Sequence, residues 1–132
     1  MSQENVEIVR DTIAAFNRGG VEAALEYLDP DIEWLGAAGW IEESLYKGHD
    51  GLRKLASYWT ENFDGYRLEL ERVIDAGDHV VALGYQCGRI KGSDDPIEQP
   101  VGYDWELRDG NGTRVQVYFS WEEALEAAGL RE

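Results

Sequence analysis

Apolar residues recur at helical spacing in three segments of the N-terminal half of the chain. The first segment ends at Gly19–Gly20, and the second ends at Asp29–Pro30. Glycine favours helix ends and proline blocks an interior helical position, so both pairs predict that a helix stops there. A third segment follows an irregular stretch, residues 36–48. The apolar positions of the three predicted helices are Val6, Val9, Ile13, Phe16, Val21, Ala24, Leu25, Leu28, Leu52, Leu55, Ala56, Trp59 and Phe63.

From residue 66 onward apolar and polar residues alternate, which is the pattern of half-buried strands. Four long strands are predicted, with turns near 76–78, 92–96 and 109–112. A short strand at 31–35 precedes them, and Ser120 with Glu123 forms a capping box that predicts a C-terminal helix. The side chains expected to form the inner wall of the sheet are Ile32, Trp34, Leu83, Tyr85, Cys87, Tyr103, Trp105, Leu107, Val115, Val117 and Phe119.

A helical half followed by a sheet half predicts an α+β fold. Strands joined by short turns pair as antiparallel neighbours. We therefore expect residues 1–132 to form one domain, in which a curved antiparallel β-sheet wraps as a cone around three N-terminal helices. A short C-terminal helix follows. A cone of this kind has an open mouth, so a pocket is expected between the sheet and the helices.

Charge and composition narrow the possible partners. The formal net charge of −15 opposes binding to nucleic acids and to anionic membranes, since both carry negative charge. One cysteine and two histidines predict neither an internal disulfide nor an ordinary zinc site, and we expect no cofactor. No apolar run approaches the roughly 18 residues that cross a membrane. The N-terminus lacks the pattern of a secretory signal, so we expect a soluble, acidic, cytoplasmic protein.

Six segments of the chain carry a family resemblance: residues 4–10, 15–19, 28–34, 46–51, 105–110 and 122–130. Together they resemble the SnoaL-like branch of the nuclear transport factor 2-like superfamily. The resemblance covers nearly the whole chain in the family's order. It implies a cone-shaped pocket, small apolar ligands or substrates, and a homodimer packed through the outer face of the sheet.

The resemblance also allows the family's catalytic positions to be compared with this chain. Steroid isomerase-like members place a tyrosine where this chain has Thr12 and a general-base aspartate near Leu35–Gly36. Their later aspartate falls at Tyr103, which offers a hydrogen-bond donor in its place. Cyclase-like members need an acid on the inner face of the last strand, where this chain has only apolar side chains. None of these catalytic sets is intact.

An apolar, aromatic wall with a few polar tips suits a small apolar ligand that one or two hydrogen bonds orient. Aromatic residues at strand spacing also form ordinary filled cores, so a core without a cavity is the alternative. If a pocket exists, the predicted ligand-binding residues are Trp34, Trp59, Tyr85, Cys87, Trp105, Val117 and Phe119.

Three hypotheses follow for function. The first is a protein that binds a small molecule without catalysis. The second is an isomerase, cyclase or hydrolase acting on a carbonyl compound, in which Tyr103 and Tyr85 polarise the carbonyl and Glu43 moves the proton. Asp104 could take the place of Glu43 if a bulge near Gly102 turned it inward. The third is a structural homodimer with a filled interior.

Overall fold

The helices of the N-terminal half follow the predicted order with one difference. The computed structural model describes residues 2–36 and 45–130. Helix α1 spans Ser2–Ala24 and is interrupted at Gly20, whose φ of 78° and ψ of −167° are not helical. The short 3₁₀ helix η1, Leu25–Tyr27, replaces the end of the second predicted helix, and helix α2 spans Gly48–Asn62.

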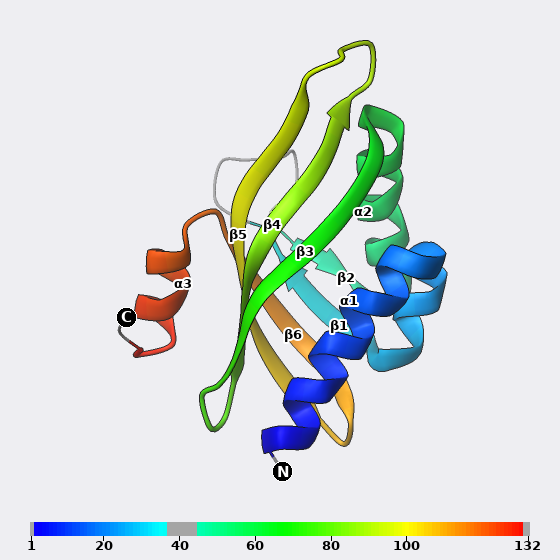
Figure 1. The fold of residues 1–132 in the computed structure, drawn as a ribbon. Coiled ribbons are helices and arrows are strands. Elements are labelled where there is room, and N and C mark those ends of the chain that lie inside the picture. The colour runs from blue at the N-terminus through cyan, green and yellow to red at the C-terminus, as the bar shows by residue number, and fades with distance from the viewer. Residues whose placement is uncertain (1, 37–44, 131–132) are drawn as a thin grey trace.

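Six strands form one curved, unclosed sheet in the order β2-β1-β6-β5-β4-β3 (Figure 1). Three of the strands are short: β1, Leu28–Leu35; β2, Leu45–Lys47; and β6, Asn111–Tyr118. The other three are long: β3, Phe63–Asp75; β4, Val80–Ile90; and β5, Pro96–Arg108. All neighbours are antiparallel except β1 and β6.

The parallel pairing of β1 with β6 makes the sheet mixed, which corrects the expectation of a purely antiparallel sheet. Short turns between β3, β4, β5 and β6 make these strands antiparallel neighbours. No hairpin joins β1 to β6, so turn lengths do not predict the direction of this pair. Strand β1 also begins earlier than predicted and contains Pro30. Proline ends helices, yet its fixed φ is compatible with extended backbone.

Helices cover both faces of the sheet. Helices α1 and α2 lie against one face, here named the inner face, and helix α3, Trp121–Ala127, lies against the other, the outer face (Figure 1). The Ser120 side chain accepts a hydrogen bond from the Glu123 backbone N–H and so begins α3 as predicted. A Cβ atom at Gly102 would lie 2.6 Å from the Cβ of Ala124, so α3 can approach β5 closely only because residue 102 is glycine.

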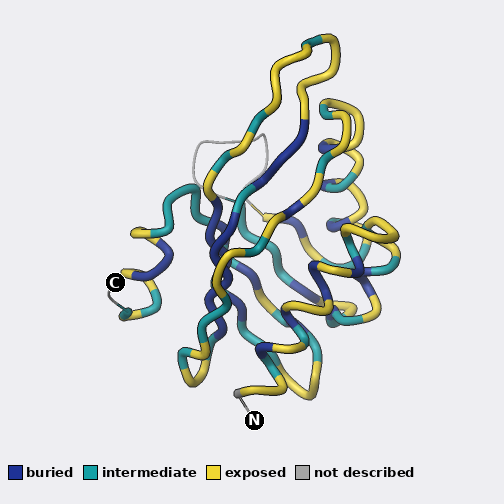
Figure 2. Tube along the Cα trace, in the orientation of Figure 1, coloured by how far each residue is buried: buried dark blue, intermediate teal, exposed yellow. Residues whose placement is uncertain are grey.

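Strand β4 is buried on both faces, and this makes one sequence-based prediction wrong. Val80 and Ala82 face α1, whereas Val81 and Leu83 pack beneath α3. Tyr85 follows on the outer face, where its ring centroid lies 5.4 Å from that of Trp121. The inner wall of β4 is therefore one residue out of phase with the prediction, and Leu83, Tyr85 and Cys87 do not belong to it. Figure 2 shows the reason: nearly all of β4 is buried, so hydrophobicity alone does not reveal which residues face inward.

Strands β3 and β5 agree with their predicted phases. Leu68, Val101, Tyr103 and Trp105 all belong to the inner core beneath α1. No register shift occurs at Gly102, so the bulge that could have turned Asp104 inward is absent there. Within residues 2–36 and 45–130, no helix has the length and apolar character of a membrane-spanning segment.

Candidate functional site

A cavity of about 90 Å³ lies between the inner face of the sheet and helices α1 and α2. This is several times the space that one water molecule needs and below the roughly 300–1,000 Å³ of pockets for drug-sized ligands. It suits a molecule with about one ring. The described lining residues are Thr12, Ile13, Phe16, Val21, Ala24, Leu28, Trp34, Gly36, Tyr46, Leu52, Leu55, Ala56, Trp59, Tyr66, Leu68, Gln86, Tyr103, Trp105, Val117 and Phe119.

Two polar contacts hold the helices over this cavity. The Asn17 side chain of α1 donates to the Leu68 carbonyl at 2.7 Å and accepts from the Leu68 N–H at 3.0 Å. His49, at the start of α2, lies 3.0 Å through Nε2 from the Leu28 carbonyl. Both contacts bind a helix to the backbone of a strand, so these side chains position the roof of the cavity.

No charged side chain lines the cavity among the described residues. Two of the hydroxyl groups in the lining are already paired. Thr12 donates its hydroxyl to the Ile8 carbonyl at 2.7 Å, within α1. Tyr66 donates its hydroxyl to Gln86 Oε1 at 2.6 Å. Burial raises the pKa of Tyr66 well above its ordinary value, so this phenol stays protonated at neutral pH.

Tyr103 provides a polar group of a different kind. Only 3% of the residue is exposed, and its hydroxyl makes no hydrogen bond with the part of the chain that the structure describes. Burial raises the pKa of Tyr103, so the group remains a neutral O–H. The ring of Trp34 packs 5.7 Å from that of Tyr103, which fixes the phenol against the wall. A ligand atom with a lone pair would meet an available donor here.

Trp105 forms the floor of the cavity and is fully buried. Its ring lies edge-to-face with Trp34 at 6.2 Å between centroids. Gly112 lies directly beneath, since a Cβ there would come within 2.9 Å of the Trp105 ring. The indole N–H of Trp105 has no acceptor among the described residues.

The predicted site residues divide into those that line the cavity and those that do not. Trp34, Trp59, Tyr103, Trp105, Val117 and Phe119 all line it. Tyr85 and Cys87 do not, because their side chains belong to the outer face of β4. Glu43 lies outside the described residues. The lining residues that the prediction missed include Tyr46 and Gln86, since 36–48 was read as irregular and the assumed phase of β4 pointed Gln86 outward.

The acids of β5 lie on the outer face, as predicted. Asp104 Oδ1 is 2.8 Å from His79 Nδ1, and Glu106 pairs with Arg114 at 3.2 Å. Both carboxylates are separated from the cavity by the thickness of the sheet. They cannot act on a molecule bound inside it.

Three potential metal ligands meet on the outer face. The Cys87 thiol and the carboxylates of Glu69 and Glu98 offer atoms within 4.8 Å of one another. Arg67 already engages Glu69 at 2.8 Å. Burial, followed by the charge of Glu69, raises the pKa of Cys87, so its thiol stays protonated and is a poor metal ligand. We assign no metal to this group.

The family profile of the SnoaL-like domain matches residues 9–119. The chain belongs to the SnoaL-like domain family. Its architecture, with helices on the inner face of a curved and unclosed mixed sheet, is the nuclear transport factor 2-like fold. No protein with a curated description matches the chain.

Solved structures support the same fold. A nuclear transport factor 2-like protein of unknown function from Burkholderia pseudomallei K96243 superposes with a TM-score of 0.79 at 21% identity, over 93% of this chain and 95% of that one. TerC co-crystallised with polyporic acid superposes with a TM-score of 0.78 at 25% identity, over 96% of this chain and 98% of that one. A protein from Jannaschia sp. CCS1 that is described as a SnoaL-like polyketide cyclase superposes with a TM-score of 0.75 at 17% identity, over 98% of this chain and 94% of that one.

Proposed function

We propose that this SnoaL-like protein binds a small, uncharged, largely apolar molecule in the cavity between α1, α2 and the sheet. The observation that carries the proposal is the lining itself: it is apolar, holds no charged side chain among the described residues, and contains one unengaged hydroxyl, that of Tyr103. TerC, at 25% identity, was co-crystallised with polyporic acid, which supports a small-molecule role for this fold.

Tyr103 orients the ligand in this proposal. The buried hydroxyl donates a hydrogen bond to a carbonyl or ether oxygen, while Trp34 and Trp105 pack against the ring that carries this oxygen. A hydrogen bond of this kind contributes about 0.5–1.5 kcal/mol, and apolar burial contributes the rest. Acetophenone, one ring with one carbonyl, has the size and polarity that this site favours.

Calorimetric titration with acetophenone and with ethylbenzene, which lacks the carbonyl, tests the proposal. We expect the wild-type protein to bind both, with acetophenone about fivefold tighter, and Tyr103→Phe to abolish this preference without weakening ethylbenzene. Val117→Trp fills the cavity and should abolish binding of both. A wild-type protein that binds neither compound would contradict the proposal.

Proton transfer on a bound carbonyl compound is a second candidate, favoured by the free Tyr103 donor and by the likeness to a protein described as a polyketide cyclase. Tyr103 would polarise the carbonyl, and Glu43 would take a proton from the neighbouring carbon. Exchange of the acetophenone methyl protons in D₂O, followed by NMR, tests this chemistry. Exchange that the protein accelerates and that Glu43→Gln removes would favour the enzyme; exchange at the rate of buffer alone leaves binding as the function.

A further inference from the structure

A second, smaller cavity of about 20 Å³ adjoins the first. Trp59, Tyr66 and Gln86 border both cavities, so these three side chains form the partition between them. None of the described residues that line the smaller cavity is charged. They are Trp59, Phe63, Tyr66, Gln86, Cys87, Ile97 and Gln99.

Two glutamines give the smaller cavity its polar character. Gln86 on β4 and Gln99 on β5 are directly paired across the two strands, so their side chains leave the sheet on the same face. Gln86 Oε1 accepts the Tyr66 hydroxyl. The Gln86 amide nitrogen and the Gln99 amide make no hydrogen bond within the described part of the chain. Donors and acceptors therefore remain for a guest at the partition.

Glycines at a bulge place Tyr66 in this position. Gly65, with φ of 65°, and Tyr66 together oppose the single residue Gly88 where the register of β3 and β4 shifts. A Cβ atom at Gly88 would lie 3.2 Å from the Asp64 carbonyl oxygen and 3.3 Å from the Tyr66 Cα. Such bulges redirect a side chain and are common beside functional sites.

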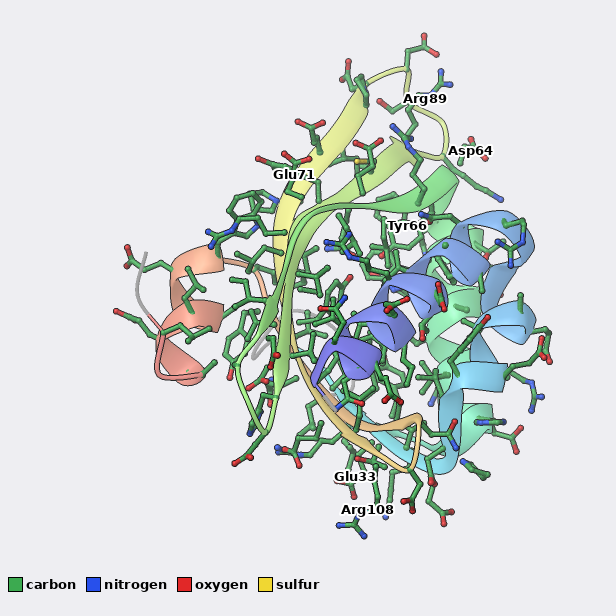
Figure 3. All side chains as sticks on the ribbon, turned by 60° about the horizontal axis from the view of Figure 1, so that its bottom comes forward. Glu33, Asp64, Tyr66, Glu71, Arg89 and Arg108 are labelled. Atoms are coloured by element: carbon green, nitrogen blue, oxygen red, sulfur yellow. The ribbon has the colours of Figure 1, made fainter. Side chains whose placement is uncertain are left out.

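The redirected Tyr66 ring lies in an aromatic stack. Its centroid is 4.8 Å from that of Trp59, and the two planes differ by 11°. In Figure 3 the labelled Tyr66 extends from β3 into the space between the sheet and the helices. The stack fixes the ring, and its hydroxyl reaches Gln86 at the boundary of the two cavities.

We propose that the two cavities bind one elongated molecule, with its apolar body in the larger cavity and a neutral hydroxyl or amide head group between Gln86 and Gln99. This inference rests on the proposed function and adds the class of ligand. The head group is uncharged because both glutamines are neutral and no cation lines either cavity among the described residues. It accepts a hydrogen bond from the Gln86 amide nitrogen and gains Gln99 as a second partner, while the Tyr66 hydroxyl stays bonded to Gln86 Oε1.

The test compares 4-propylphenol with propylbenzene, which differ only in the hydroxyl group. Titration calorimetry should show that the wild-type protein prefers 4-propylphenol about tenfold. We expect Gln99→Leu to reduce this preference to about twofold while the affinity for propylbenzene stays unchanged. Gln99 is only partly buried, so the variant should keep the fold, which its thermal unfolding midpoint verifies.

Gln116→Leu is the matched control, because Gln116 is opposite Asp104 and lies on the outer face. It should keep the wild-type preference. Equal binding of the two compounds by the wild-type protein, or a preference that survives Gln99→Leu, would overturn the inference and leave the proposed function standing. If neither compound binds while acetophenone does, the elongated site is wrong; if acetophenone also fails, the proposed function is wrong as well.

Discussion

Tyr66 and Tyr103 bring hydroxyl groups into an otherwise apolar interior, from β3 and β5. Burial raises the pKa of both phenols. The Tyr66 hydroxyl is bonded to Gln86, and the Tyr103 hydroxyl has no partner in residues 2–36 and 45–130. Both groups therefore serve as neutral hydrogen-bond partners across the physiological pH range. In the function that we propose, their chemistry is recognition of a polar atom, with Tyr103 as donor.

These raised pKa values predict a loss of stability at alkaline pH. An unfolded chain releases tyrosine protons near pH 10, whereas the folded chain retains them, so the folded state loses stability as the pH rises above about 10. We expect the free energy of unfolding in urea to fall from about pH 9 to 11. Tyr103→Phe should flatten this fall, and Tyr58→Phe, at a 40% exposed position, should not. Equal slopes in wild type and Tyr103→Phe would contradict the prediction.

At the level of single residues, the sequence predicted part of the cavity lining. Trp34, Tyr103, Trp105, Val117 and Phe119 were predicted for the inner wall of the sheet and Trp59 for the helix that closes it, and each lines the cavity. Gln86 was missed because Tyr85 and Cys87, its neighbours on the outer face, looked like the more natural inner residues. Alternation shows which residues of a strand share a face. When both faces are buried, both carry apolar residues, so hydrophobicity does not show which face points inward.

Asn17 connects two elements by bonding both backbone groups of Leu68. Strand β3 is the last strand of the sheet, so one of its sides has no neighbouring strand within the described part of the chain. The Asn17 amide takes the place of that neighbour at Leu68 and fixes α1 beside β3. The helical pattern of α1 did not reveal this role, because Asn17 reads as a polar residue near a helix end.

Removal of this amide should loosen α1. We expect Asn17→Ala to lower the free energy of unfolding by about 1–2 kcal/mol, since two backbone groups lose their partner. Hydrogen exchange should show faster exchange of the Leu68 amide proton. Asn62→Ala, which removes only a bond within α2 to the Tyr58 carbonyl, is the control and should leave Leu68 protected. An unchanged Leu68 rate in Asn17→Ala would show that the contact is dispensable.

Gly102 sets the distance between α3 and the sheet. An added Cβ would meet the Ala124 Cβ at 2.6 Å, so Gly102→Ala should displace α3 and cost about 1–3 kcal/mol of stability. The compensating double variant with Ala124→Gly should recover part of this loss. Fluorescence of Trp121, whose indole N–H donates to the Gly84 carbonyl at 2.9 Å, reports whether α3 has moved. A stable Gly102→Ala variant with wild-type fluorescence would refute this account.

At the scale of elements, hairpins were predicted more reliably than distant pairings. The turns between β3, β4, β5 and β6 are short, and their antiparallel order was predicted correctly. The parallel pair of β1 and β6 depends on how the whole chain folds back, which no local signal encodes. Strand β2 is three residues long and lay within a segment predicted to be irregular.

The whole molecule carries a formal net charge of −15, and the charged side chains that the structure describes lie outside the cavity lining. Like charges at this density repel one another and destabilise the folded chain. The paired carboxylates of Glu22, Glu69 and Glu106 relieve only part of this repulsion. In Figure 3 labelled charged residues lie at opposite ends of the molecule, with Asp64 and Arg89 at one end and Glu33 and Arg108 at the other.

Screening of this charge should stabilise the protein. We expect the thermal midpoint to rise by several degrees between 0.01 and 0.15 M NaCl, over which the screening length falls from about 30 Å to about 8 Å. The triple variant Glu61→Gln, Glu71→Gln, Glu98→Gln removes three exposed charges and should reduce this rise. A midpoint that falls with added salt would mean that ion pairs outweigh the repulsion.

Strand β3 is an edge strand, and this position affects the tendency of the protein to aggregate at high concentration. Thirteen residues long, this strand presents a row of backbone groups to which another chain could add, and such additions initiate amyloid-like aggregation. Asn17 closes that row near its middle, and the bulge at Glu71 bends it. If α1 detaches, the backbone groups of β3 become accessible to another chain. The Asn17 side chain therefore helps to prevent one molecule from acting as a template for the aggregation of others.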